Sequence, residues 1–247
     1  MPRYRYDGSF EGLLTAIQEI LARGERGAEI LGAEDGNLPL FPPELVATRQ
    51  QAARSLLEAF SAYGGKKGLR LVVLLFLADG APRERLILDY VRLTLQQERE
   101  IGGWLTHPVV AEAVAVAGRV AGEVHRFKGL LRFRQLADGS LYAPFEPDHN
   151  IAAALAPHFA RRLRGERWLI HDCRRGLGIF WDGRELVPAA VAGGIADPEL
   201  SEGEDFFQAC WRSYHHHISV AERRNPNLQR HFMPKRYWRY LTEFNGV

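Results

Sequence analysis

Histidine and aspartate side chains that could transfer protons gather in the second half of the sequence. Asp148 and His149 lie in the segment EPDHN, and His171 and Asp172 lie in WLIHDC. Histidine changes charge near neutral pH, so a pair drawn from these four residues could act as general acid and base or bind a metal ion. Their spacing matches neither HExxH nor CxxC, and we expect no metal site on this chain.

These residues also have structural interpretations, which the sequence leaves open. Neighbouring residues on a regular strand point to opposite faces, so His171 and Asp172 cannot form an acid–base pair with each other unless a bulge intervenes. His171 shares its face with Leu169, which is typical of a partly buried histidine. Asp148 or Asn150 could instead cap the helix that is expected to follow.

Three consecutive histidines, His215–His217, are more conspicuous but form a poor metal site. They lie in FFQACWRSYHHHISV, whose apolar spacing is helical. Consecutive helical residues diverge by about 100°, so three in a row cannot bind one ion, and we predict a structural or surface role. The predicted core-facing residues of this helix are Phe207, Cys210, Trp211, Tyr214 and Ile218.

Cationic and aromatic side chains alternate in the last segment, AERRNPNLQRHFMPKRYWRYL. Cations beside aromatic rings commonly hold single-stranded nucleic acid, and carboxamides can read base edges. Alternatively, Phe232, Trp238 and Leu241 pack this segment on the core. The candidate contacts are Asn225, Gln229, Lys235, Arg236 and Trp238, and the neighbouring cations include Arg223, Arg224 and Arg230.

Two further arginines lie two residues apart in LLRFRQL. On a strand, Arg132 and Arg134 would share a face at a separation of about 7 Å and could bind neighbouring phosphates. The alternative is the solvated face of a half-buried sheet. Pro144 predicts that the partner strand LYAPF lies at a sheet edge.

The distribution of charge favours an anionic partner. Residues 119–247 carry 19 Lys and Arg against 15 Asp and Glu, and seven of these acids lie within residues 182–205. The cationic excess outside that stretch suits nucleic acid. The alternative is a general arginine bias, since the chain has 28 Arg and 4 Lys.

Composition excludes several other classes. Two cysteines, Cys173 and Cys210, are too few for a disulfide framework, a zinc ribbon or an iron–sulfur cluster on this chain alone. No apolar run reaches the roughly 18 residues of a membrane span, and the first residues lack the apolar region of a secretory signal. We therefore expect a cytoplasmic protein with no cofactor on this chain and no membrane partner.

The hydrophobic pattern predicts an α+β fold with a mainly helical first half. Residues 66–79 fit a buried strand or, as we favour, a helix. The other helices predicted in this half span residues 10–21, 43–63, 83–99 and 106–122.

The second half is predicted to contain two β-hairpins that flank a helix over residues 151–164. Residues 183–204 are predicted to form a mobile loop, and a helical segment follows. We expect a mainly helical region over residues 1–122 and a basic α+β region over residues 123–247, packed as one compact unit.

Two long blocks, residues 123–183 and 222–238, resemble a bacterial family of unknown function whose members are described as DNA-metabolism or DNA-repair proteins. The first contains EVHRFKGLLRFRQL, EPDHN and HDCRRG, and the second is ERRNPNLQRHFMPKRYW. Because YDGSFEGLL also fits the opening of the family, the resemblance covers almost the whole chain.

The resemblance implies an accessory partner of a radical-SAM protein that modifies or repairs DNA. In other members the domain precedes an X-type uracil-DNA glycosylase domain. The sequence contains neither that glycosylase nor the radical-SAM cysteine motif, so we expect such chemistry to come from a partner chain. The family motifs add His125 to the catalytic candidates His149, His171 and Asp172, and add Arg126, Lys128 and Arg175 to the nucleic-acid contacts.

The sequence therefore supports three hypotheses. The first is a DNA-binding accessory protein in repair or modification that works with the radical-SAM partner. The second is a nucleic-acid-processing enzyme that uses His149, His171 and Asp172 for acid–base or metal chemistry. The third is a protein–protein assembly module without direct DNA contact.

Overall fold

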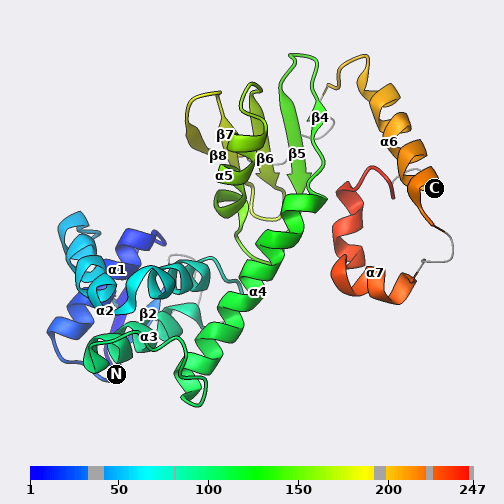
Figure 1. Ribbon diagram of the computed structural model, residues 1–247. Coiled ribbons are helices and arrows are strands. Elements are labelled where there is room, and N and C mark those ends of the chain that lie inside the picture. Colours follow the sequence, from blue (N-terminus) through cyan, green and yellow to red (C-terminus); the bar gives the residue numbers. More distant parts are fainter. Residues whose placement is uncertain (33–41, 81, 192–198, 221–224, 245–247) are drawn as a thin grey trace. The chain divides into compact units, whose positions relative to one another are not determined.

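The computed structural model describes residues 1–32, 42–80, 82–191, 199–220 and 225–244 (Figure 1). The chain divides into two compact units, Met1–Ala121 and Gly122–Val247. Arg223 and Arg224, two of the predicted cations, lie outside the described residues.

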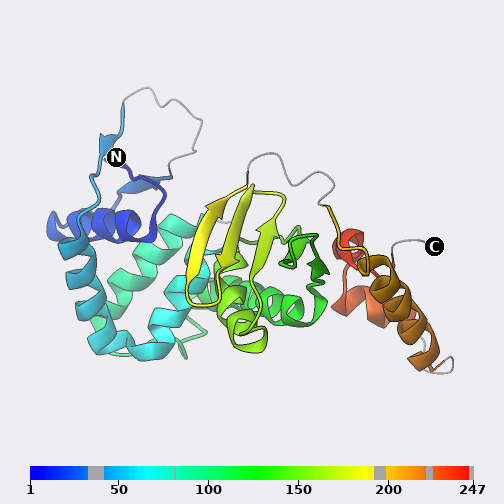
Figure 2. The ribbon, with the colours of Figure 1, turned by 90° about the horizontal axis from the view of Figure 1, so that it is seen from above.

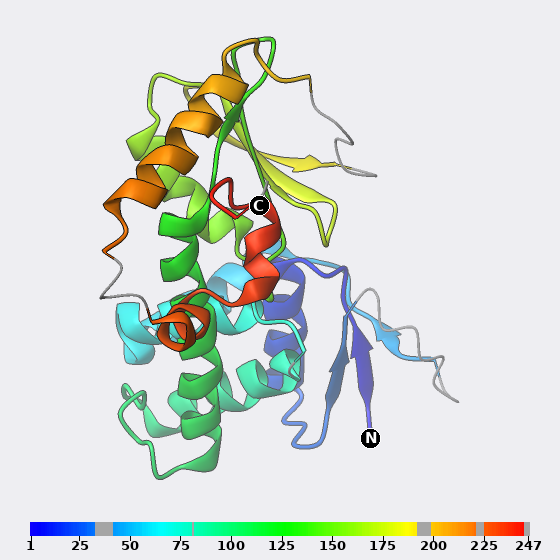
Figure 3. The ribbon, with the colours of Figure 1, turned by 90° about the vertical axis from the view of Figure 1, so that its right-hand side faces the viewer.

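The first unit combines three short parallel strands with helices. The strands are β1 (Arg3–Arg5), β2 (Glu29–Leu31) and β3 (Glu44–Leu45), in the order β2-β1-β3 (Figure 3). The helices are α1 (Phe10–Ala22), α2 (Gln50–Phe76) and α3 (Arg83–Gln97). Ser9 begins α1, because its hydroxyl accepts a hydrogen bond from the backbone N–H of Gly12.

Residues 66–76, within the segment that fits either a strand or a helix, belong to α2. The preceding Gly65 has φ 58° and ψ −167°, so α2 consists of two helical segments joined at this residue. Glycine adopts this backbone conformation without a steric penalty. The predicted helix is therefore confirmed, with a glycine break at its start.

The second unit is built around a five-stranded mixed sheet, which α4 (Pro108–Leu130) precedes in the chain. The strands are β4 (Arg134–Gln135), β5 (Leu141–Phe145), β6 (Trp168–Asp172), β7 (Leu177–Trp181) and β8 (Leu186–Ala190). The helices are α5 (Ala152–Arg162), α6 (Glu204–Ile218), α7 (Pro226–Phe232) and the 3-10 helix η2 (Lys235–Tyr240). The strands lie side by side in chain order (Figure 2). β5 and β6 are parallel and are connected by α5, whereas the other neighbours are antiparallel.

Strand alternation assigns the side chains of β6 to two faces of the sheet. On the face towards α5, the Phe133 ring lies 5.1 Å from Phe159 of α5 and 6.2 Å from Trp168 of β6, measured between ring centroids. His171 points to the other face, where it contacts Tyr142 of β5. The alternation therefore separates His171 from Asp172, as the sequence predicted.

The predicted α+β class is confirmed, with a helical first half, two hairpins that flank α5 and a helical C-terminal segment. Part of the predicted loop over residues 183–204 is instead the edge strand β8, which pairs with the free side of β7. β5 is an inner strand rather than the edge strand that Pro144 suggested. Because β4 pairs only with Leu141 and Tyr142, it ends before Pro144 and does not require an N–H there.

Candidate functional site

The loop between β5 and α5 gathers several of the predicted site residues. It comprises residues 146–150, EPDHN, and we call it the EPDHN loop. It follows the carboxyl end of β5, next to the carboxyl end of the parallel strand β6. Ligands of open α/β sheets bind outside the carboxyl ends of such strands, so this edge is the first candidate site.

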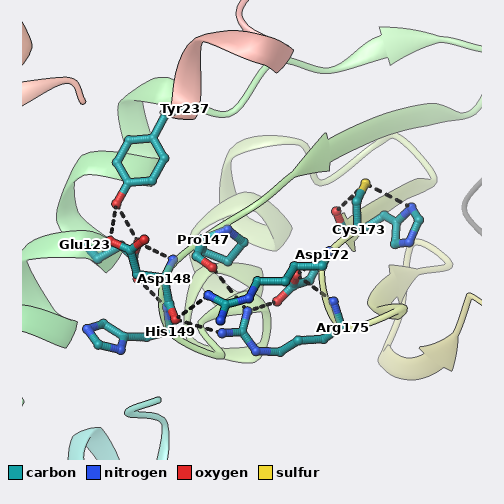
Figure 4. A network of polar contacts seen from close by, with 10 residues as sticks. Glu123, Pro147, Asp148, His149, Asp172, Cys173, Arg175 and Tyr237 are labelled. Carbon is teal, nitrogen blue, oxygen red and sulfur yellow. Dashed lines mark hydrogen bonds and ion pairs between the residues drawn. The ribbon is translucent and has the colours of Figure 1, made fainter. Parts of the chain in front are cut away.

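Glu123 of α4 fixes the backbone of the EPDHN loop (Figure 4). Its buried carboxylate accepts hydrogen bonds from the backbone N–H groups of Asp148 at 2.7 Å and His149 at 2.9 Å. It also accepts a 2.7 Å hydrogen bond from the Tyr237 hydroxyl. Burial and the neighbouring Glu123 carboxylate raise the pKa of Tyr237, which therefore stays protonated and able to donate.

Asp172 and Arg175 connect the turn after β6 to the same loop (Figure 4). The buried Asp172 carboxylate accepts the backbone N–H groups of Arg174 and Arg175 and forms a 2.6 Å ion pair with the Arg175 guanidinium. That guanidinium also donates to the backbone carbonyl of Asp148 at 2.8 Å. Asp172 is therefore engaged in holding two loops together rather than presented to a substrate.

The 3-10 helix η2 contacts the acidic side chains of the EPDHN loop. The Arg236 guanidinium forms an ion pair with Asp148. Glu146 accepts hydrogen bonds from Arg239 at 2.9 Å and from the Tyr240 hydroxyl at 2.6 Å. The basic C-terminal segment thus partly neutralises acids of its own unit, which leaves Arg236 less available to phosphates.

His171 is enclosed in the sheet. Its Nδ1 lies 2.6 Å from the Tyr142 hydroxyl, and its side chain is completely buried. Burial lowers the pKa of His171 and raises that of the neighbouring Cys173 thiol, so both groups are neutral near pH 7. A substrate cannot reach His171 without movement of the surrounding residues.

His149 and His125 are more accessible. The backbone N–H of His149 is bound by Glu123, while its half-exposed ring points away from the Asp172–Arg175 pair (Figure 4). His125 is exposed on α4, two residues after Glu123. The four catalytic candidates therefore lie in separate environments: His171 and Asp172 on opposite faces of the sheet, His149 in the EPDHN loop and His125 on the surface of α4.

The two arginines expected on one strand do not both lie in it. Arg134 lies in β4, but Arg132 precedes this strand, because β4 contains only two residues. The Arg132 guanidinium forms a 2.6 Å ion pair with Glu243 and lies over the Trp211 ring, 5.1 Å from its centroid. Arg132 is therefore engaged with an acid of its own unit, which leaves it less available to a phosphate than the sequence suggested.

A cleft of about 860 Å³ lies between α6 and α7. Asn225 and Gln229, the two carboxamides that were predicted to read bases, both line it. Its aromatic lining residues are Phe232 and Phe244. The cationic and imidazole side chains that line it are Arg212, His215 and His216. We call this space the α6–α7 cleft.

The predicted core face of α6 is wrong. Phe207, Tyr214 and Ile218 are 62%, 55% and 58% exposed, and Cys210 is exposed as well. Trp211 is partly exposed, and its indole N–H donates a 2.9 Å hydrogen bond to Glu243. The spacing correctly predicted an amphipathic helix, but the described part of the chain does not cover its apolar face.

The remaining predicted contacts lie on α4 and η2. Arg126 and Lys128 are half-buried on α4. Lys235 is exposed, with its ammonium 5.9 Å from the centroid of the Trp238 ring. Trp238 donates from its indole N–H to the Met233 carbonyl and stacks on Phe244 at 4.3 Å between centroids.

The comparisons with known proteins identify a family. The model of a domain of unknown function, DUF4130, matches residues 81–243. The chain belongs to this family. The DUF4130 match contains the EPDHN loop and, apart from Phe244, the residues that line the α6–α7 cleft, but not the N-terminal segment YDGSFEGLL that the resemblance included. No curated protein and no solved structure matches the chain.

Within the DUF4130 region, Glu123 and Tyr237 hold central positions that the sequence analysis did not single out. A signal for Glu123 was present, because it lies on the same helical face as Val116, Val120 and Phe127, all of which are buried. A carboxylate on an apolar helix face requires buried donors. The identity of those donors was not visible in the sequence.

Among the residues that the structure describes, no group of three or more His, Cys, Asp and Glu side chains is arranged to hold a metal ion. No helix in the same part of the chain is both long and apolar enough to cross a membrane.

Proposed function

We propose that this chain is a DNA-binding accessory protein in DNA repair or modification that works with a radical-SAM partner. The supporting observation is an exposed surface on α6, α7 and η2 that combines aromatic rings with cations. Such surfaces hold single-stranded nucleic acid, because rings stack on bases while cations attract phosphates.

The aromatic part of this surface is extensive. Phe206, Phe207, Tyr214 and Phe232 are 68%, 62%, 55% and 63% exposed. Large rings at this exposure carry a cost in water and usually mark a binding surface. Stacked nucleobases would cover them and recover the apolar burial.

The cationic part of this surface lies on α7 and η2. Arg230 and Lys235 are exposed. Two of the neighbouring acids are engaged: the buried Glu204 accepts the backbone N–H of Gln135 at 2.9 Å, and Glu243 pairs with Arg132. An approaching phosphate would therefore meet exposed cations on α7 and η2, whereas the exposed acids Glu202 and Asp205 lie near the start of α6.

The radical-SAM partner is proposed on the family resemblance and on the chemistry that this chain lacks. Its two cysteines cannot supply the cysteine motif of a radical-SAM cluster. The accessory chain would hold the DNA, and the partner enzyme would carry out the reaction on it.

Binding of a fluorescent single-stranded oligonucleotide at several salt concentrations tests DNA binding. We expect the logarithm of the association constant to fall linearly with the logarithm of salt concentration, because bound phosphates release counterions. Affinity that is absent at low salt or unaffected by salt would refute the proposal. Arg230→Ala should reduce the slope by about one unit, since it removes one phosphate contact.

A protein-assembly module is a second candidate, and the exposed face of α6 favours it. Phe207, Trp211, Tyr214 and Ile218 follow the i, i+4, i+7, i+11 spacing of a helix that packs in a groove. A pull-down of the radical-SAM partner after nuclease treatment separates the two candidates. Capture that persists without nucleic acid favours assembly, whereas capture that requires DNA favours the DNA-binding role.

The geometry gives less support to an independent enzyme. His171 and Asp172 are buried and hydrogen-bonded, which leaves His149 and His125 as the accessible candidates. If the isolated chain processed damaged oligonucleotides, and His149→Ala abolished that activity, the enzyme hypothesis would replace the accessory role.

A further inference from the structure

We propose that the α6–α7 cleft receives an unpaired base of single-stranded DNA. This inference rests on the proposed DNA-binding function and goes beyond it by naming the part of the nucleic acid that is bound and the residues that bind it.

The size and lining of the cleft suit one or more nucleobases. Its volume of about 860 Å³ lies within the range of pockets for small organic molecules. Phe232 on α7 is 63% exposed and lines the cleft, so its ring is accessible for stacking. Nucleobases are flat and aromatic, which suits stacking on such a ring.

A second ring in the cleft is held in place by its neighbours. Phe244 stacks on Trp238 with ring centroids 4.3 Å apart and an interplanar angle of 14°. The Trp238 indole is itself fixed by its hydrogen bond to the Met233 carbonyl. Phe244 is therefore positioned before a ligand arrives, which reduces the entropy cost of binding.

The polar groups of the cleft suit the edge of a base. The Oδ1 of Asn225 accepts a hydrogen bond from the backbone N–H of Leu228. This bond caps the start of α7 and fixes the orientation of the Asn225 side chain. The Gln229 carboxamide, one helical turn further on, has both a donor and an acceptor for a base edge. Arg212 of α6 adds a cation to the lining for the phosphate backbone.

The acid that lines the cleft does not repel an anionic strand strongly. The Glu243 side chain is 4% exposed and forms its 2.6 Å ion pair with Arg132.

A base that enters the cleft must have an exposed ring face, whereas a paired base in a duplex is covered by its neighbours. We therefore expect the full chain to prefer single strands to duplexes of the same sequence.

The test compares three variants of the full chain in binding to a short single-stranded oligonucleotide over a range of salt concentrations. Phe232→Leu removes one ring, and Gln229→Met removes the carboxamide at similar size. Tyr63→Leu is the matched control, because Tyr63 is a partly exposed aromatic residue of α2 in the first unit. We expect Phe232→Leu to weaken binding roughly ten-fold, from the loss of one stacking contact.

The salt dependence distinguishes stacking from charge. Removal of a ring releases no counterions, so Phe232→Leu and Gln229→Met should lower the affinity while leaving the salt slope unchanged. Equal affinity for single strand and duplex, or wild-type affinity of both cleft variants, would overturn the base-binding inference and leave the cleft to a protein segment. If wild-type protein shows no salt-dependent binding, the proposed function fails first and the inference fails with it.

Discussion

The Tyr237 hydroxyl donates a 2.7 Å hydrogen bond to the buried carboxylate of Glu123, which lies 114 residues earlier in the chain. The same carboxylate accepts two backbone N–H groups of the EPDHN loop. One buried acid thus connects α4, the loop after β5 and the C-terminal η2. Its donors belong to two segments, the EPDHN loop and η2. The loss of one donor should therefore destabilise both of these segments.

Tyr237→Phe should lower the free energy of unfolding of the second unit by about 1 kcal/mol, the usual net contribution of one hydrogen bond. Glu123→Ala should cost about 2–3 kcal/mol, because it leaves two loop N–H groups without their acceptor. Amide hydrogen exchange of Asp148 and His149 provides a local measurement. We expect faster exchange in Glu123→Ala than in Tyr237→Phe, and equal rates in both variants would contradict the assignment of Glu123 as the loop acceptor.

Asp172→Asn should destabilise the protein by roughly 3 kcal/mol, since it breaks a buried ion pair and leaves the Arg175 guanidinium without its carboxylate. Urea unfolding measures the change. Asp182→Asn is a matched control, because the Asp182 carboxylate also accepts two backbone N–H groups, those of residues 184 and 185, but on the surface. If the two substitutions lower the unfolding free energy equally, the ion pair with Arg175 adds no stability to that of the backbone hydrogen bonds in the turn.

The stability of the protein should fall as the pH drops below about 6.5, in part because of His171. Burial lowers the pKa of His171 in the folded state, so the unfolded state binds a proton first as the pH decreases. Above the unfolded pKa both states are neutral, and the contribution is constant. The groups that face His171 are Tyr142 and Cys173, which remain neutral, and the adjacent Asp172, whose charge opposes the shift.

Unfolding of wild type and His171→Gln between pH 5 and pH 7.5 tests this expectation. The variant should lose part of the decline towards low pH, and His217→Gln, at an exposed position of α6, controls for the removal of a histidine side chain. A decline that is identical in all three proteins would show that His171 does not titrate on unfolding.

Arg132→Gln should affect the fold more than DNA binding. Burial would by itself raise the pKa of Glu243, but the hydrogen bonds from Arg132 and Trp211 hold it below its usual range. Without Arg132, we expect the pKa of Glu243 to rise, the unfolding free energy to decrease and the fluorescence of Trp211 to change. The salt slope for DNA should stay at the wild-type value. A salt slope reduced by about one unit would instead indicate that Arg132 contacts a phosphate.

The sequence by itself determined most of the helices and the separation of His171 from Asp172. The helix bounds were less accurate, because the helix predicted from residue 43 begins at Gln50 and the one predicted to end at residue 122 continues to Leu130. Helical spacing, the turn glycines and strand alternation are local properties, and each acts within a few residues. The same local reasoning ruled out the triple histidine as a metal site. It missed the short strands β2 and β3, and it missed β8, because a five-residue edge strand with Pro188 does not stand out from its acidic, glycine-rich and proline-rich surroundings.

The tertiary structure decided which charged side chains form ion pairs and which apolar faces are buried. The sequence alone predicts Arg132 and Arg236 to be free cations. In the structure Arg132 pairs with Glu243, and Arg236 pairs with Asp148, each more than 80 residues away in the chain. The aromatic face of α6 read as core, yet the described chain leaves it exposed. Pairing and burial depend on contacts between distant segments, and a local pattern specifies that a face is apolar without specifying what packs against it.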